Sequence, residues 1–77
     1  MDKQPLRDLG ERIRQRRKAM GWSQEELALV AEIDRSYVGG VERGQRNLTF
    51  TVLCRLCEAL KCDVATLTVD LPALLSK

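Results

Sequence analysis

The amino-acid sequence predicts an all-α fold in which five short helices form one domain. Apolar residues recur at the three- and four-residue spacing of helices, cap residues separate the apolar segments, and no segment alternates as a strand would. The chain of 77 residues has 44% hydrophobic and 31% charged residues, as ordinary globular domains do. We therefore expect residues 1–77 to fold as a single helical domain around a small aliphatic core.

The first helix is predicted from about Leu6 to Met20, with an apolar stripe that lies between arginines. Gly21 is placed to end this helix in a left-handed cap. Basic residues outnumber acidic ones between Arg7 and Lys18, although the net charge of the chain is only +2. Such a basic segment suits an anionic partner, but a solvated helix face would have the same composition.

Two further helices are predicted in close succession. Ser23 can cap a helix over about Gln24–Ala31, because the sequence SQEE has the form of a capping box. After a short turn, Asp34 can cap a helix over about Arg35–Arg43. Two short helices joined in this way predict a helix-turn-helix at about residues 24–43.

The last two helices are predicted in the second half of the chain. Thr49 can cap a fourth helix that continues to about Leu60, and Asp63 can cap a short fifth helix with the sequence VATLT. The tail VDLPALLSK contains Pro72, and the sequence assigns it no conformation. The apolar stripe of the fourth helix consists of Leu53, Leu56, Cys57 and Leu60.

The third helix combines polar residues at its start with two glycines in its middle. If its valines anchor it inward, the residues that face outward are Arg35, Ser36, Tyr37, Gly39 and Gly40. A guanidinium can donate two hydrogen bonds to guanine, and glycines would let the helix backbone approach DNA closely. This surface therefore suits the major groove of DNA, unless the helix breaks at Gly39.

The segment SQEELALVAEIDRSYVGGVERGQRNLTFTVLCRLCEAL resembles the Cro/C1-type (XRE) helix-turn-helix regulators of phages and bacteria. Within that family, DRSYVGGVERGQRN is most similar to the controller proteins of restriction–modification systems. The resemblance implies a compact five-helix, lambda-repressor-like DNA-binding domain, and no cofactor is expected. It extends over about Leu6 to Leu67 and rests on the ordered set Gln24, Leu27, Ala28, Ile33, Val38, Glu42, Gly44 and Asn47.

The resemblance also implies roles for individual residues. Gln24 would contact a phosphate, and Arg46 and Asn47 would grip the phosphates beside the site. Arg17 and Glu42 would form an ion pair that ties the first helix to the third. The residues expected to contact DNA are Gln24, Arg35, Ser36, Tyr37, Gly39, Gly40, Arg43, Arg46 and Asn47.

The sequence departs from the family pattern at several positions. Glu32 and Lys61 stand where the family often has glycine, so we expect some backbone strain, or a slightly different turn, at Glu32. Leu48 replaces a frequent proline. Gly40 occupies a position where relatives carry a base-reading side chain, so direct readout would depend heavily on Arg35.

Cys54, Cys57 and Cys62 raise the alternative of a redox or metal site. The chain has no histidine and only one CxxC motif, so no metal is expected, and we interpret the cysteines as packing residues. The odd number of cysteines, the absence of a signal peptide and the lack of a membrane-length apolar segment predict a cytoplasmic protein without membrane contact. For a bacterial DNA-binding regulator, this means association with the nucleoid.

The second half of the chain is expected to form a homodimer, as the resemblance implies, over about residues 50–75. The predicted partner is a palindromic operator in double-stranded DNA, where the protein would block or contact RNA polymerase. The alternative is an antitoxin that binds a toxin through the tail DLPALLSK, whereas no nucleophile and base indicate an enzyme. The apolar residues expected in the dimer interface are Phe50, Val52, Leu56, Leu67, Val69 and Leu71.

Overall fold

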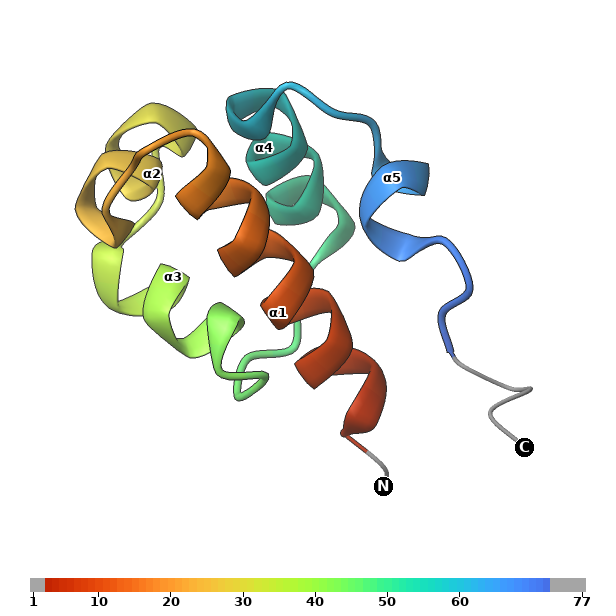
Figure 1. The fold of residues 1–77 in the computed structure, drawn as a ribbon. Helices are drawn as coiled ribbons and strands as arrows, with labels where there is room; N and C mark the ends of the chain where they lie inside the picture. The colour runs from red at the N-terminus through yellow and green to blue at the C-terminus, as the bar shows by residue number, and fades with distance from the viewer. Residues whose placement is uncertain (1–2, 73–77) are drawn as a thin grey trace.

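The computed structural model describes residues 3–72, in which five helices surround one small core (Figure 1). No strand occurs in this part of the chain, and the predicted all-α class is confirmed. The tail and the dimerisation region predicted to about residue 75 extend beyond the described residues. The helices are α1 (Gln4–Ala19), α2 (Gln24–Ala31), α3 (Arg35–Glu42), α4 (Phe50–Leu60) and α5 (Val64–Thr68).

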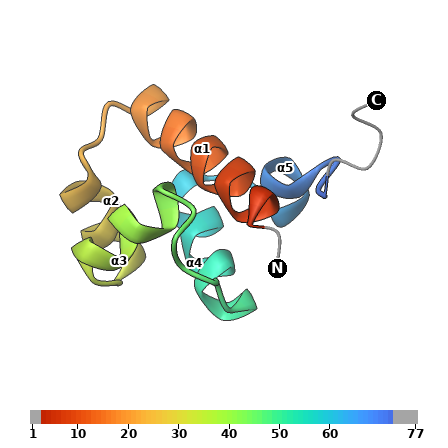
Figure 2. The same ribbon diagram turned by 90° about the horizontal axis from the view of Figure 1, so that it is seen from below.

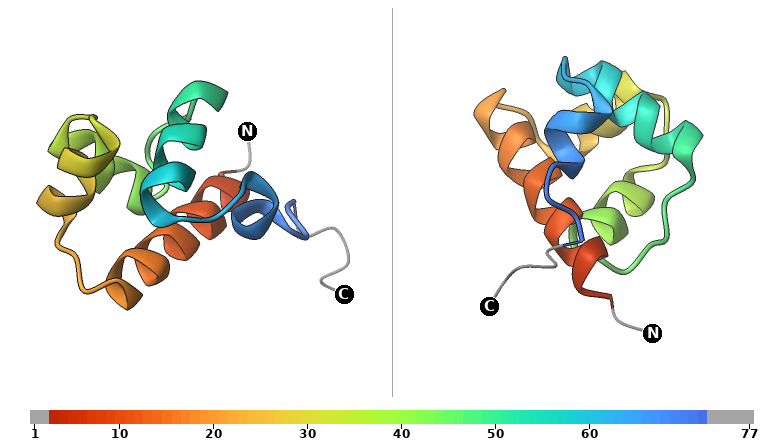
Figure 3. Two further views of the ribbon diagram at one scale, coloured as in Figure 1. Left: turned by 90° about the horizontal axis from the view of Figure 1, so that it is seen from above. Right: turned by 90° about the vertical axis from the view of Figure 1, so that its right-hand side faces the viewer.

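The long helix α1 lies between the two ends of the molecule. Seen from below, α2 and α3 lie side by side at one end and α5 lies at the other (Figure 2). Seen from the right-hand side, α5 lies in front, next to α1 and α4 (Figure 3). No helix between residues 3 and 72 combines the length and apolar character that a bilayer crossing requires.

Side-chain caps fix where α2, α3, α4 and α5 begin. Ser23 accepts a hydrogen bond from the Glu26 amide at 3.1 Å, and the Glu26 carboxylate accepts one from the Ser23 amide at 2.7 Å. The predicted capping box is therefore present, and it satisfies two amide groups that the helix itself leaves unpaired. Asp34, Thr49 and Asp63 cap the other three helices through backbone amides, as the sequence predicted.

Two helices end at residues that have left-handed backbone geometry without being glycine. Glu32 ends α2 and Lys61 ends α4, each with a φ angle of 59°. This geometry costs a residue with a Cβ atom roughly 1–2 kcal/mol, which explains why glycine suits both positions. The expected strain at Glu32 is therefore confirmed, and Lys61 has the same conformation.

The core receives at least one almost completely buried side chain from every helix. Burial of an aliphatic side chain of this size stabilises a fold by about 1.5–3 kcal/mol. The largest such side chains are Ile13, Leu27, Val38, Leu56, Leu60 and Leu67.

The core includes two residues that the sequence placed in a dimer interface. Leu56 is 0% exposed and Leu67 is 2% exposed within one chain, so that prediction is wrong for both. The apolar stripe of α4 faces its own core, and Leu67 packs into the same cluster from α5. Neither side chain is accessible to a partner.

Gly10 allows α1 and α3 to approach each other closely. A Cβ atom at this position would lie 2.7 Å from the backbone oxygen of Glu42, closer than real Cβ contacts occur. Because backbone atoms cannot move aside as a flexible side chain can, any larger residue would push the two helices apart. Sequence patterns alone did not predict this contact.

A buried ion pair joins α1 to the end of α3. Arg17 Nε donates to Glu42 Oε2 at 2.7 Å, and Arg17 Nη2 donates to Glu42 Oε1 at 3.0 Å. The two side chains are 9% and 2% exposed. Hydrogen bonding to Glu42 raises the pKa of Arg17, so this guanidinium stays protonated. The pair implied by the family resemblance is thus present.

The same ion pair extends to α2 and to the turn before it. Arg17 Nη1 donates to the backbone oxygen of Trp22 at 2.7 Å. Gln24 Nε2 donates to Glu42 Oε1 at 3.0 Å. No buried side-chain nitrogen or oxygen is left without a hydrogen bond among residues 3–72. The network therefore connects α1, α2 and α3 through satisfied polar groups.

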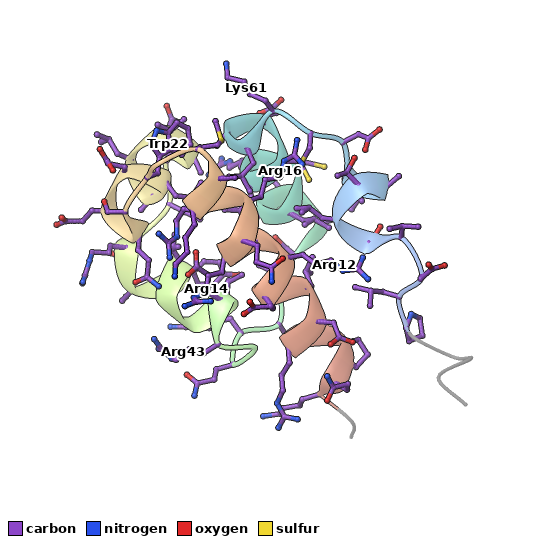
Figure 4. All side chains as sticks on the ribbon, viewed as in Figure 1. Arg12, Arg14, Arg16, Trp22, Arg43 and Lys61 are labelled. Atoms are coloured by element: carbon purple, nitrogen blue, oxygen red, sulfur yellow. The ribbon has the colours of Figure 1, made fainter. Side chains whose placement is uncertain are left out.

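Two other arginines of α1 bind the carboxyl ends of α4 and α5. Arg12 Nη1 donates to the backbone oxygens of Leu67 at 3.0 Å and Val69 at 2.6 Å. Arg16 Nε donates to the backbone oxygen of Leu60 at 3.2 Å. Figure 4 shows both arginines on the α4 and α5 side of α1. The basic segment of α1 thus serves the fold in part, which neither sequence interpretation anticipated.

Cys57 belongs to the apolar core, and Cys62 packs against it. Cys57 is buried, whereas Cys54 and Cys62 are half-buried, and all three are free thiols. Burial, followed by the neighbouring Cys62, raises the pKa of Cys57 to about 11, so its thiol is protonated at neutral pH. Between residues 3 and 72, no three or more His, Cys, Asp or Glu side chains gather as metal ligands. These observations support the packing interpretation.

Loss of the buried cation should destabilise the fold strongly. Substitution Arg17→Met leaves the Glu42 carboxylate buried without its partner, so we expect the free energy of unfolding to fall by about 3–5 kcal/mol. The double substitution Arg17→Met with Glu42→Leu should lose much less. Urea unfolding followed by circular dichroism measures these differences.

The exposed pair between Arg14 and Glu11 is the matched control. Its atoms are 3.4 Å apart and its side chains are 42% and 51% exposed. Glu11→Gln should therefore change the free energy of unfolding by less than about 1 kcal/mol. Equal losses in the Arg17→Met single and double variants would contradict the proposed importance of the buried charge.

Candidate nucleic-acid interface

The helices α2 and α3, joined by residues 32–34, form a helix-turn-helix. Ala28 is buried where the two helices pack, and its backbone oxygen accepts a hydrogen bond from the Ile33 amide at 3.0 Å. Val38 and Val41 are buried on the inner side of α3, as the sequence predicted. This anchoring places the start of α3 at the surface.

The first turn of α3 presents hydrogen-bonding groups to solvent. Arg35 and Ser36 are exposed, and Tyr37 is half-buried against the core. The Arg35 side chain makes no hydrogen bond or ion pair with the other described residues. A guanidinium in this position can donate two parallel hydrogen bonds to an acceptor pair such as guanine O6 and N7.

Ser36 is already engaged by the cap of its own helix. Its hydroxyl and its amide both donate to Asp34 Oδ2, the amide at 3.1 Å. The hydroxyl bond is the main reason why the pKa of Asp34 is lowered. Ser36 can therefore accept a hydrogen bond from a ligand, but it must leave Asp34 to donate one. Sequence reasoning treated Asp34 only as a cap and missed this carboxylate beside the exposed residues Arg35 and Ser36.

The two glycines of α3 are not exposed on the surface of the helix. Helix α3 continues through both to Glu42, so the alternative that it breaks at Gly39 is wrong. Both glycines are classed among the buried residues of α3. The predicted outward exposure of Gly39 and Gly40 is therefore also wrong, because long side chains lie over them.

The side chains that cover the glycines come from α2 and from the end of α3 onward. A Cβ atom at Gly39 would lie 3.1 Å from Arg43 Nη1 and 3.5 Å from Gln24 Oε1. A Cβ atom at Gly40 would lie 2.8 Å from Arg46 Cγ. Sequence spacing could place the glycines on one face, but it could not show which side chains would fold across that face.

The structure gathers three arginines along the outer side of α3. Arg46 holds its Cζ atom 5.2 Å from the centre of the Tyr37 ring, within cation–π range. Arg43 Nε donates to Gln45 Oε1 at 2.9 Å, and Figure 4 shows Arg43 at the outer edge of the molecule. Together with Arg35, these groups offer only donors and positive charge. Such a surface suits phosphate oxygens and the acceptor edge of guanine.

The other residues expected to contact DNA lie beside this cluster. Asn47 is exposed in the loop between α3 and α4. Gln24 lies at the start of α2, but its amide nitrogen already binds Glu42, so its oxygen faces Gly39. A phosphate contact from the Gln24 nitrogen would compete with the buried ion pair. Of the residues expected to bind DNA, Gln24, Arg43 and Arg46 thus lie over the two buried glycines, whereas Arg35, Ser36 and Asn47 are exposed.

Comparison with known proteins agrees with this geometry. The helix-turn-helix family model matches residues 13–67. The control protein C.SmaI from Serratia marcescens is 41% identical over 59 residues, which cover 77% of this chain and 70% of that protein. Both results cover most of the chain and include α2 and α3.

Solved structures show the same arrangement of helices. The restriction–modification controller protein C.AhdI from Aeromonas hydrophila has a TM-score of 0.79 and 48% identity, over 80% of this chain and 94% of that one. The hypothetical transcription factor NHTF from Neisseria has a TM-score of 0.79 and 37% identity, over 90% and 80% of the two chains. The chain therefore belongs to the XRE-type helix-turn-helix family and is a DNA-binding transcription regulator similar to restriction–modification controller proteins.

Proposed function

We propose that this protein controls transcription by binding a palindromic operator as a homodimer, in the manner of a restriction–modification controller protein. The observation that carries the proposal is the exposed Arg35 at the start of α3, beside the arginines that cover the outer side of the helix. In the proposed complex, Arg35 binds guanine in the major groove. Arg43, Arg46 and Asn47 bind the phosphates on either side.

A second copy of the chain supplies the second reading helix. Phe50 is 70% exposed and Val69 is 57% exposed, and both belong to the α4 and α5 part of the chain. Val52 and Leu71 are half-buried and can add to the same interface. The proposed interface thus keeps Phe50, Val52, Val69 and Leu71.

Binding of two half-sites explains why a small domain can act as a regulator. A single α3 contacts few base pairs. Two copies related by two-fold symmetry bind the two halves of a palindrome, so the discrimination ratios of the two half-sites multiply. An operator beside a promoter lets the dimer exclude RNA polymerase or contact it. We place this activity in the bacterial cytoplasm, at the nucleoid.

Sequence selection from random double-stranded DNA tests the proposal directly. The purified full-length protein should enrich a two-fold symmetric sequence whose half-site centres lie about one helical turn apart. Enrichment of a single unpaired half-site would exclude the symmetric dimer. Absence of any enriched sequence at moderate salt would exclude sequence-specific control.

Substitution of two arginines should separate base reading from phosphate binding. Arg35→Ala should lower discrimination at one base pair of each half-site by about 1–3 kcal/mol. Arg46→Ala should weaken binding to all sequences and reduce the salt dependence by about one counterion for each half-site. Fluorescence anisotropy with the selected operator and single-base variants, over a range of salt concentrations, measures both effects.

The control for these variants is Arg55→Ala. Arg55 is an exposed arginine on α4 that lines a shallow depression with Val30 and Glu58. Its loss removes the same charge from a different surface, so operator affinity should stay close to that of the wild type. If Arg35→Ala and Arg55→Ala behave alike, the assigned reading surface is wrong.

The proposed dimer can be tested by placing charge on its apolar surface. Phe50→Glu and Val69→Glu should each raise the dimer dissociation constant by about tenfold or more, because each buries an unpaired carboxylate. Leu29→Glu is the control, since Leu29 is 79% exposed on α2 outside the proposed interface. Sedimentation equilibrium over a range of protein concentrations, with circular dichroism to check folding, measures the effect. A monomeric wild type, or equal dissociation by Leu29→Glu, would exclude this interface.

A further inference from the structure

The side chain of Arg46 fills the space that a side chain at position 40 would need. A Cβ atom built at Gly40 would lie 2.8 Å from Arg46 Cγ, 3.4 Å from Nε and 3.6 Å from Cδ. The first distance is shorter than real Cβ contacts, and it involves the stem of the arginine and not its flexible end. Any residue larger than glycine would therefore displace the Arg46 stem.

Tyr37 holds the far end of the same arginine. Its ring centre lies 5.2 Å from Arg46 Cζ, and Tyr37 and Gly40 are three residues apart, on one face of α3. The charge of Arg46 also makes a small contribution to the lowered pKa of Asp34, behind the larger effect of the Ser36 hydrogen bonds. The guanidinium therefore points from the loop toward the beginning of α3, where Arg35 lies.

We propose that Gly40 is a positioning residue, which with Tyr37 forms a seat for Arg46 on the outer side of the reading helix. In this seat Arg46 is held in place before DNA binds, so it loses less rotamer freedom when it contacts the duplex. The consequence for DNA binding rests on the proposed function. The seat itself is a property of the free protein.

This role differs from the usual reason for glycine on a DNA-facing helix. If Gly40 only let the α3 backbone approach DNA, Arg46 would be irrelevant to the effect of substitution at position 40. Both explanations predict weaker DNA binding for Gly40→Ala. The two roles are separated by asking whether the effect depends on Arg46.

Nuclear magnetic resonance of the free protein tests the seat without DNA. In the wild type, the side-chain resonances of Arg46 should be shifted upfield by the Tyr37 ring, and Gly40→Ala should move them toward the values of an exposed arginine. Gly39→Ala is the matched control, because the atoms nearest to a Cβ there belong to the ends of other side chains, Arg43 Nη1 at 3.1 Å and Gln24 Oε1 at 3.5 Å, and not to Arg46. Unshifted Arg46 resonances in the wild type, or no response to Gly40→Ala, would overturn the proposal.

A double-mutant cycle then tests the consequence for DNA binding. Gly40→Ala should weaken operator binding by about tenfold in the wild-type background and by less than about twofold when Arg46 is already alanine. Equal losses in the two backgrounds would mean that Gly40 acts by direct approach to DNA, and the positioning role would be wrong. If the wild type selects no DNA sequence, the proposed function fails, while the resonances of Arg46 still decide whether the seat exists.

Discussion

The buried pair of Arg17 and Glu42 determines where α3 lies. It joins α1 to Glu42, the last residue of α3, through two hydrogen bonds, and it reaches α2 through Gln24. A bidentate pair has one favourable geometry, so it fixes orientation as well as distance. Gly10 provides the close helix contact that this geometry needs. Apolar burial supplies most of the stability, but these polar contacts fix how α3 is oriented relative to α1 and α2.

Local sequence signals predicted the helices well, because caps act over a few residues. Ser23, Asp34, Thr49 and Asp63 each bond an amide two or three positions later, and such signals can be read without knowledge of the fold. The helix-turn-helix followed from the same signals and from the inward valines. The expectation of an unusual backbone at Glu32 came from the family resemblance, because nothing in a glutamate itself indicates left-handed geometry.

The errors arose where contacts depend on the assembled fold. Periodicity places Leu56 on the apolar stripe of its helix, but it cannot show whether the core of the same chain or a second chain covers that stripe. Similarly, spacing placed Gly40 on the outer face of α3, but only the folded loop brings Arg46 over it. The basic residues of α1 also appeared as one run, although Arg12 and Arg16 bind backbone oxygens at the ends of other helices. Long side chains reach too far for sequence patterns to predict their partners.

The two hydrogen bonds from Arg12 to the end of α5 help to fix the position of α5 relative to α1. Arg12 and Arg17 lie on the same rod, roughly 8 Å apart along its axis at the rise of an α-helix. Arg12 binds the end of α5, beside the proposed dimer surface, and Arg17 binds the end of α3. We expect a helix that is held at both points to bend little, so that the two ends of the domain move together. In a dimer, the distance between the two α3 helices would then be set by the fold and not by the bound DNA.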